Sequence, residues 1–208
     1  MFMNSKPVLN NIHLILASGS PRRKDLLEGI GVRFEVIPSD VDETFLPFET
    51  PIEGVKRLSF EKAREVSQNY PGHWVIGADT VVVIGGRVLG KPLDEDEAKI
   101  MLSSLNGTTH EVYTGFSVVN SECMDKTVTD FCRSEVFIRP LSAQEIAEYV
   151  ATGEPMDKAG SYAIQGLGAA IVQSVNGSYT NVVGLPLCEV ARELKRLNIY
   201  DFLKAPKP

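Results

Sequence analysis

Residues 17–23, with the sequence ASGSPRR, combine side chains that bind anions. They follow an apolar run that predicts a strand and precede a run that predicts a helix. Ser20 is expected to be the N-cap of this helix, with Pro21 as its first residue. Arg22 and Arg23 then stand in the first turn, where the helix dipole disfavours cations unless an anion docks there. The free backbone N–H groups and the two guanidinium groups therefore predict a phosphate site.

The alternative for this turn, which includes Ser18, is a capped helix whose arginines face solvent. The turn is not a P-loop, because the glycine spacing and the terminal Lys-Ser/Thr pair of that motif are absent. Its chemistry would therefore depend on the arginines and on the start of the helix.

Asp79 is a carboxylate in the middle of an apolar segment, residues 74–84, that predicts a buried strand. An ionised carboxylate is costly there unless it is paired or bound to a metal. Asp79 therefore belongs either to a structural hydrogen-bond network or to a site where it binds a metal or acts on water. Gly77 and Ala78, directly before it, are expected to let a substrate approach the backbone closely.

A second carboxylate is expected from the acidic loop at residues 39–44, which contains Asp40, Asp42 and Glu43. Such a loop is usually only solvated. If it lies near bound phosphates, however, it would need a bridging divalent cation such as Mg²⁺, which takes oxygen ligands and retains waters. Glu43 is the preferred partner of Asp79 for this role.

Two lysines and a glutamine complete the candidate site residues. Lys62 lies in a predicted helix, and Lys91 lies in a turn that the following proline stiffens; each either reaches a phosphate or faces solvent. Gln165 lies in the glycine-rich segment 159–169, which suits a ligand loop or a tight turn between core elements. Because an amide both donates and accepts hydrogen bonds, Gln165 could bind the edge of a base.

Strand and helix patterns alternate along the 208 residues and predict a single α/β domain with a mixed central sheet. Two capping boxes, at residues 50–53 and 142–145, and a cap at residues 94–97 mark helix starts. The expected strands are residues 14–16, 34–37, 74–84, 87–89, 112–119 and 127–138. The expected helices begin near residues 20, 50, 94, 142 and 186 and end near residues 30, 70, 106, 153 and 197.

The net charge of −6 argues against a broad nucleic-acid-binding surface but leaves room for a local basic pocket. Three cysteines without metal-ligand spacing indicate a reducing compartment. No apolar run has the length of a membrane span, and the first residues lack the apolar core of a signal peptide. These features favour a cytoplasmic protein that binds neither nucleic acid polymers nor membranes. The three histidines form no metal or triad pattern, and we expect them to be structural or at the surface.

Taken together, these motifs resemble the Maf family of nucleoside triphosphate pyrophosphatases. The resemblance runs from about residue 13 to residue 197. The matching segments are residues 16–23, 42–43, 61–63, 77–80, 90–92, 113–115, 159–169 and 181–186. The arginine turn is the most specific of them.

The resemblance implies an α/β fold of two lobes with a cleft between them, like the inosine-triphosphate pyrophosphatases. It implies hydrolysis of a nucleoside triphosphate to the monophosphate and pyrophosphate, a divalent cation (Mg²⁺ or Mn²⁺), and a homodimer. The family roles would make Asp79 the proton acceptor, although the residues leave open whether it is the base or a metal ligand beside Glu43. The residues implied in specificity are Arg22, Thr80 and Gln165. Those implied in the phosphate and metal site are Ser18, Arg23, Glu43, Lys62 and Lys91.

Gln165 indicates the branch of the family. The branch that resembles a dTTP/UTP pyrophosphatase carries Gln in an Ile-Gln-Gly setting, whereas a branch that prefers 7-methyl-GTP carries Glu there. A carboxylate suits a cationic methylated purine, while a neutral amide donates to O4 and accepts from N3–H of thymine or uracil. We therefore expect dTTP and UTP, including modified pyrimidine triphosphates, as substrates. A flipped amide also fits cytosine, so the exclusion of CTP must depend on other residues.

Three alternatives stand beside this hypothesis. The chain could prefer 7-methyl-GTP or hydrolyse non-standard nucleotides broadly. It could instead be a nucleotide-binding regulator of cell division, because the family's name comes from an association with septum formation. Such a regulator would bind nucleotide without needing chemistry at Asp79. The third alternative is an α/β domain with no active site.

Overall fold

The computed structural model describes residues 13–201 and residue 203. The expected single domain over residues 1–208 extends beyond this description at both ends. Within it, the chain forms seven strands and six α-helices around one sheet. In this described part, no helix is long and apolar enough to cross a membrane.

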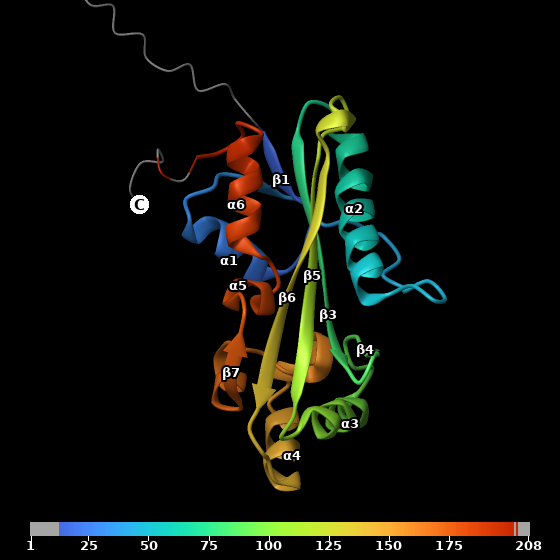
Figure 1. The fold of residues 1–208 in the computed structure, drawn as a ribbon, viewed down its shortest axis with the longest axis vertical. Coiled ribbons are helices and arrows are strands. Elements are labelled where there is room, and N and C mark those ends of the chain that lie inside the picture. Colours follow the sequence, from blue (N-terminus) through green and yellow to red (C-terminus); the bar gives the residue numbers. More distant parts are fainter. Residues whose placement is uncertain (1–12, 202, 204–208) are drawn as a thin grey trace, which may run out of the picture.

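Three strands of 11 residues each run along the long axis of the molecule (Figure 1). They are β3 (Trp74–Ile84), β5 (Thr109–Val119) and β6 (Val128–Ile138), and they pair antiparallel in that order. Most residues of β3 and β5 are buried, because helices pack against these strands at both ends of the molecule.

Shorter strands extend the sheet on either side. Its order is β2-β1-β3-β5-β6-β7, and β4 forms a hairpin with β3. Because β1 pairs parallel with both β2 and β3, the sheet is mixed, which confirms the predicted fold class. The short strands are β1 (Leu14–Leu16), β2 (Glu35–Val36), β4 (Arg87–Leu89) and β7 (Val172–Asn176).

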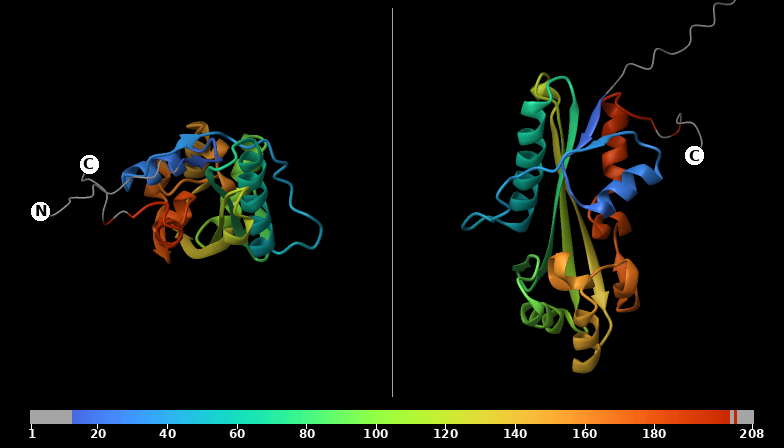
Figure 2. Two further views of the ribbon diagram at one scale, coloured as in Figure 1. Left: turned by 90° about the horizontal axis from the view of Figure 1, so that it is seen from above. Right: turned by 180° about the vertical axis from the view of Figure 1, so that it is seen from behind.

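Helices cover both faces of the upper part of the sheet (Figures 1 and 2). On one face, α1 (Pro21–Gly29) and α6 (Leu187–Arg196) pack on a core that includes Leu16 and Ile76. On the other face, α2 (Pro51–Asn69) packs over Ile15 and its neighbours. Ile15 and Leu16 are neighbours in β1 and point to opposite faces, as expected of a strand that is buried on both faces.

A second core lies at the opposite end of the long strands, around α3 (Glu95–Leu105) and α4 (Ala143–Ala151). The molecule therefore has two packed ends joined by β3, β5 and β6, as the two-lobed expectation required. The short helix α5 (Tyr179–Val183) lies between these ends (Figure 1).

Two glycines let α2 lie unusually close to the sheet. A Cβ atom on Gly77 would stand 2.2 Å from the carbonyl oxygen of Ser59, and one on Gly115 would stand 2.2 Å from that of Val55. The expectation that Gly77 and Ala78 admit a substrate is therefore wrong. Gly77 accommodates a helix, and Ala78 is fully buried in the core on the opposite face.

The predicted helix starts are confirmed, with one difference in how a cap is made. The hydroxyl or carboxylate oxygens of Thr50, Asp94 and Ser142 each accept a hydrogen bond from the backbone N–H three residues later. Ser20 also occupies its predicted N-cap position, but its hydroxyl makes no capping bond. Instead, the Ser18 hydroxyl accepts a hydrogen bond from the Ser20 N–H at 3.3 Å.

His110 is buried at the end of the molecule where α3 and α4 lie, as its structural interpretation predicts. Its side chain is 2% exposed, and its Nε2 lies 2.7 Å from the hydroxyl of Tyr162. Its Nδ1 has no hydrogen-bond partner in the described part of the chain. Burial lowers the pKa of His110 from 6.5 to about 4, so the folded protein keeps this ring neutral.

We expect the free energy of unfolding to fall by about 2 kcal/mol between pH 7 and pH 5. The unfolded chain protonates His110 as pH falls below 6.5, whereas the folded chain does so only near pH 4, so acid favours unfolding in this window. Urea unfolding at both pH values measures the loss. His110→Phe should lose about 2 kcal/mol less stability than the wild type between these pH values, whereas the half-buried control His73→Gln should lose as much as the wild type. An equal loss in His110→Phe and in the wild type would contradict the assignment.

Candidate active site

A cavity of about 420 Å³ opens between the two ends of the molecule. The turn before α1, the middle of β3, the acidic loop, the turn after β4 and the segment 157–165 all contribute to its wall. Five cationic side chains and three carboxylates line it, so the cavity carries a net positive charge in a chain of net charge −6. These groups are Arg22, Arg23, Lys62, Lys91, Lys158, Glu43, Asp79 and Asp157.

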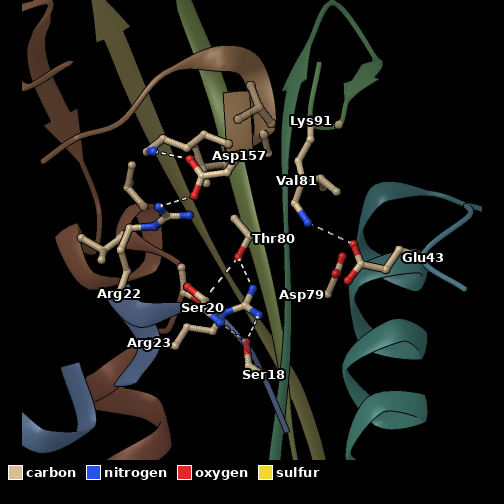
Figure 3. Close-up of a pocket in the computed structure, with 18 of the residues that line it drawn as sticks. Ser18, Ser20, Arg22, Arg23, Glu43, Asp79, Thr80, Val81, Lys91 and Asp157 are labelled. Atoms are coloured by element: carbon tan, nitrogen blue, oxygen red, sulfur yellow. Dashed lines mark hydrogen bonds and ion pairs between the residues drawn. The ribbon is translucent and has the colours of Figure 1, made fainter. Parts of the chain in front are cut away.

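The structure brings every predicted site residue to this one cavity, although their roles stay predictions. Asp79 and Thr80 lie between the arginines on one side and Glu43 and Lys91 on the other (Figure 3). The nine residues are Ser18, Arg22, Arg23, Glu43, Lys62, Asp79, Thr80, Lys91 and Gln165.

Neutral oxygens hold Arg23 in place. Its guanidinium donates to the carbonyl of Gly184 at 2.8 Å, to the hydroxyl of Ser18 at 3.0 Å and to the hydroxyl of Thr80 at 3.2 Å. In the described residues, no carboxylate forms an ion pair with it. Since a guanidinium has five N–H donors, these three bonds leave two donors and an unpaired charge for an anion.

Burial lowers the pKa of Arg23, and the negative charges of Asp79 and Glu43 oppose that effect. Arginine nevertheless remains protonated in proteins. The arginine therefore supplies a fixed positive charge at the base of the cavity.

Arg22 faces a carboxylate from the other end of the molecule. Its Nη1 lies 3.2 Å from Oδ2 of Asp157, which belongs to the short 3₁₀ turn η2 (Glu154–Asp157). The side chain of Arg22 is 27% exposed and that of Asp157 is 64% exposed. Such an exposed pair contributes little stability, so an incoming anion can replace Asp157 at low cost.

Lys62 is a buried ammonium held between two carboxylates. It reaches the cavity from α2, and its Nζ lies 2.6 Å from Oδ1 of Asp79 and 2.7 Å from Oε1 of Glu43. The side chains of Lys62 and Asp79 are 6% and 9% exposed. Asp79 is therefore a paired buried charge, as its structural interpretation requires.

Glu43 connects this pair to the outer part of the cavity. Its Oε2 lies 3.5 Å from Nζ of Lys91, while Oε1 contacts Lys62. Partial burial would raise the pKa of Glu43, but the hydrogen bonds and charges of Lys62 and Lys91 outweigh burial and hold this pKa below its ordinary value. Glu43 is therefore ionised at neutral pH.

Glu43 and Asp79 are the two carboxylates that converge on one point of the cavity, since both contact the same ammonium. In residues 13–201 and 203, no group of three or more His, Cys, Asp or Glu side chains is arranged to hold a metal ion.

Gln165 lies at the rim of the cavity, in the segment predicted to be a ligand loop. Its side chain is exposed, and its amide makes no hydrogen bond to another described residue. The segment consists of two short 3₁₀ turns, η3 (Ala159–Ser161) and η4 (Gly166–Ala170), on either side of the glutamine.

Comparisons with known proteins agree on one family. The family model described as Maf-like protein matches residues 13–197. The chain belongs to the Maf family. A relative from Bacillus cereus named dTTP/UTP pyrophosphatase is 52% identical over 186 residues, which cover 89% of this chain and 96% of the relative. A relative of the same name from Geotalea uraniireducens is 51% identical over 189 residues, which cover 91% and 97%.

Solved structures resemble this Maf protein more distantly. The Ham1 protein of Staphylococcus aureus matches with a TM-score of 0.45 and 16% identity, over 77% of this chain and 79% of that one. A nucleoside-triphosphatase / dITP/XTP pyrophosphatase from Mycobacterium abscessus matches with a TM-score of 0.42 and 15% identity, over 93% and 100%.

Asp157 and Lys158 are cavity residues that sequence reasoning missed. Asp157 contacts Arg22, which is 135 positions away, so no local pattern connects the two. The one available signal was the acidic turn that follows Gly153, directly before the glycine-rich segment. Partner residues for an arginine in the first turn of a helix have to be sought in such distant turns.

We expect Lys62→Met to lower the free energy of unfolding by about 3 kcal/mol, because it leaves the buried Asp79 carboxylate without its counter-charge. Chemical denaturation at pH 7 measures the change. Lys91→Met is the matched control, since Lys91 is exposed and contacts Glu43 at 3.5 Å. That control should stay within about 0.5 kcal/mol of the wild type. Equal losses in the two variants would show that the Lys62 pair is not the source of stability.

Proposed function

We propose that this Maf-family protein hydrolyses dTTP and UTP to the monophosphate and pyrophosphate, and acts on modified pyrimidine triphosphates in the same way. The observation that carries the proposal is the placement of Asp79 in one cavity with five cationic side chains, which suits a triphosphate and a water molecule. The names of relatives that are 51–52% identical over nearly the whole chain support the choice of nucleotides.

The phosphate chain is proposed to bind at the start of α1. Among the described residues, Arg23 has no ion-pair partner and keeps two free N–H donors, and Arg22 pairs only with the exposed Asp157. Backbone N–H groups at the helix start add further donors for anionic oxygens. On the opposite wall, Lys91 and Lys62 would complete the set of cations around the phosphates.

Asp79 is proposed to act on the attacking water. Its Oδ1 accepts a hydrogen bond from Lys62, while its Oδ2 accepts none from another described residue and can receive a proton. The water oxygen forms a bond to the α-phosphorus, the bond to the α–β bridging oxygen breaks, and the water proton passes to Asp79. The cations stabilise the charge that develops on the departing pyrophosphate.

A divalent cation, Mg²⁺ or Mn²⁺, fits Glu43 and Asp79. These carboxylates already converge on a cation, the ammonium of Lys62, and they offer the oxygen ligands that both metals prefer. Mg²⁺ commonly takes only one or two carboxylates and completes its shell with waters and substrate phosphates. When bound, the ion would neutralise charge on the phosphates.

Gln165 is proposed to read the pyrimidine. Its exposed amide lines the rim of the cavity and has no partner within the described chain, so both its donor and its acceptor are free. Thr80, which resemblance also implies in specificity, instead uses its hydroxyl to hold Arg23 and to bond with Thr114 at 2.9 Å. Any effect of Thr80 on substrate choice would therefore be indirect, through the position in which it holds Arg23.

Pyrophosphate release from a panel of nucleoside triphosphates, with and without EDTA, tests the proposed function. We expect activity on dTTP and UTP that EDTA abolishes and added Mg²⁺ or Mn²⁺ restores. Activity confined to 7-methyl-GTP would replace the proposed substrate. Nucleotide binding without any release would favour the regulatory alternative.

Asp79→Asn should lower kcat by a factor of about 10² to 10⁴, the contribution expected of a general base, while nucleotide binding is largely kept. Steady-state kinetics and equilibrium binding of UTP measure the two effects. Asp157→Asn is a matched control, because it removes a carboxylate from the same cavity but away from Lys62. That control should retain turnover. Full activity in Asp79→Asn would remove the proposed base.

Gln165→Glu should lower kcat/KM for dTTP and UTP by about tenfold to a hundredfold, because a carboxylate cannot donate to O4 of the base. Activity on 7-methyl-GTP, which a carboxylate suits better, is the second readout. Gln173→Glu adds the same charge at an exposed position outside the cavity and should leave the profile unchanged. An unchanged profile in Gln165→Glu would show that this side chain does not read the base.

A further inference from the structure

One carboxylate that does not line the cavity holds the segment that carries Gln165. Glu154 accepts hydrogen bonds from the backbone N–H groups of Leu167 at 2.9 Å and Gly168 at 2.8 Å. It also accepts one from the hydroxyl of Tyr149 at 2.8 Å. Three donors from two separate segments therefore converge on a single side chain.

Tyr149 extends this contact to the other side of Gln165. Its hydroxyl accepts a hydrogen bond from the backbone N–H of Ala163 at 3.1 Å, and its side chain is buried at 7% exposure. Glu154 and Tyr149 therefore fix the backbone two residues before Gln165 as well as two and three residues after it. Gln165 therefore lies between two stretches of backbone that are held in place, while its side chain makes no hydrogen bond to another described residue.

Gly166 and Gly168 make room for the contact between Glu154 and this loop. A Cβ atom on Gly166, where φ is 67°, would stand 2.4 Å from Oε2 of Glu154. One on Gly168 would stand 2.2 Å from the carbonyl oxygen of Ala163. These glycines allow the loop to close around the carboxylate, as a tight turn requires. The segment also lines the cavity, so its role as a ligand loop stays a prediction.

Glu154 carries a charge at neutral pH. Burial alone would raise its pKa, but the hydrogen bonds from Leu167, Gly168 and Tyr149 outweigh burial and lower this pKa. A charged acceptor makes stronger hydrogen bonds than a neutral one, so the loop is held more firmly than a neutral side chain would hold it.

We propose that Glu154 is the positioning residue for Gln165, setting the place of its amide for the pyrimidine edge. The inference rests on the proposed function, since it assumes that Gln165 contacts the base. Because the Gln165 amide has no partner of its own within the described chain, the backbone that Glu154 and Tyr149 hold determines where it lies. A displacement of about 1 Å at such a contact is enough to cost catalytic efficiency.

Glu154→Gln tests the inference through a double-mutant cycle with Gln165→Ala. The variant keeps the shape of the side chain but turns an amide NH₂ toward backbone donors. We expect it to lower kcat/KM for dTTP by about tenfold when Gln165 is present and by less than about twofold in the Gln165→Ala background. Equal effects in both backgrounds would overturn the inference, because a merely structural role does not depend on Gln165.

Glu145→Gln is the matched control. Glu145 likewise accepts from a backbone N–H, in the capping box of α4, and hydrogen bonds lower its pKa to about 2, but it does not line the cavity. We expect it to lower Tm without changing kcat/KM in either background. A loss of kcat/KM in this control that equals the loss in Glu154→Gln would also overturn the inference.

Tyr149→Phe repeats the cycle if Glu154→Gln fails to fold, because it removes only the hydroxyl that links Glu154 to Ala163. The same dependence on Gln165 is expected, and its absence would overturn the inference. The two proposals fail differently. A wild-type protein that does not hydrolyse dTTP or UTP contradicts the proposed function itself, whereas additive effects in active variants contradict only the role of Glu154.

Discussion

A lysine ammonium buried between two carboxylates is the interaction on which the cavity depends. Asp79 lies in a strand that is buried on both faces, and an unpaired charge there would be costly. Lys62 reaches it because Gly77 and Gly115 allow α2 to lie against β3 and β5. The backbone spacing and the ion pair thus require each other. A side chain at either glycine would move the helix and separate the two charges.

The wall of the cavity at the start of α1 differs, because the described residues do not fully compensate the charges of its two arginines. Arg23 is held by three neutral oxygens, and Arg22 by one exposed carboxylate. The start of α1 adds the positive end of a helix dipole. Such an arrangement is unfavourable on its own and becomes favourable around a polyanion. The stability lost at this wall is therefore the physical basis for expecting a phosphate ligand.

The sequence predicted those features whose causes are local. Capping boxes located α2 and α4, apolar runs located the long strands, and the arginine turn located one wall of the cavity. Contacts between distant segments were not predictable: Asp157 with Arg22, and Glu154 beneath Gln165, join residues with no shared pattern. The strand β7 and the helix α5 were missed because both are short and largely polar or half-exposed. The role of Gly77 was predicted wrongly, because a glycine is needed both where a helix packs closely on a strand and where a ligand does.

The most direct test of this account is a crystal structure with Mg²⁺ and an α,β-imido analogue of UTP, which the enzyme cannot cleave. The account predicts that the phosphates contact Arg22 and Arg23, that the α-phosphorus faces Asp79, and that the uracil lies against Gln165. Phosphates bound elsewhere, with both guanidinium groups facing solvent and Lys62 still between its two carboxylates, would contradict it.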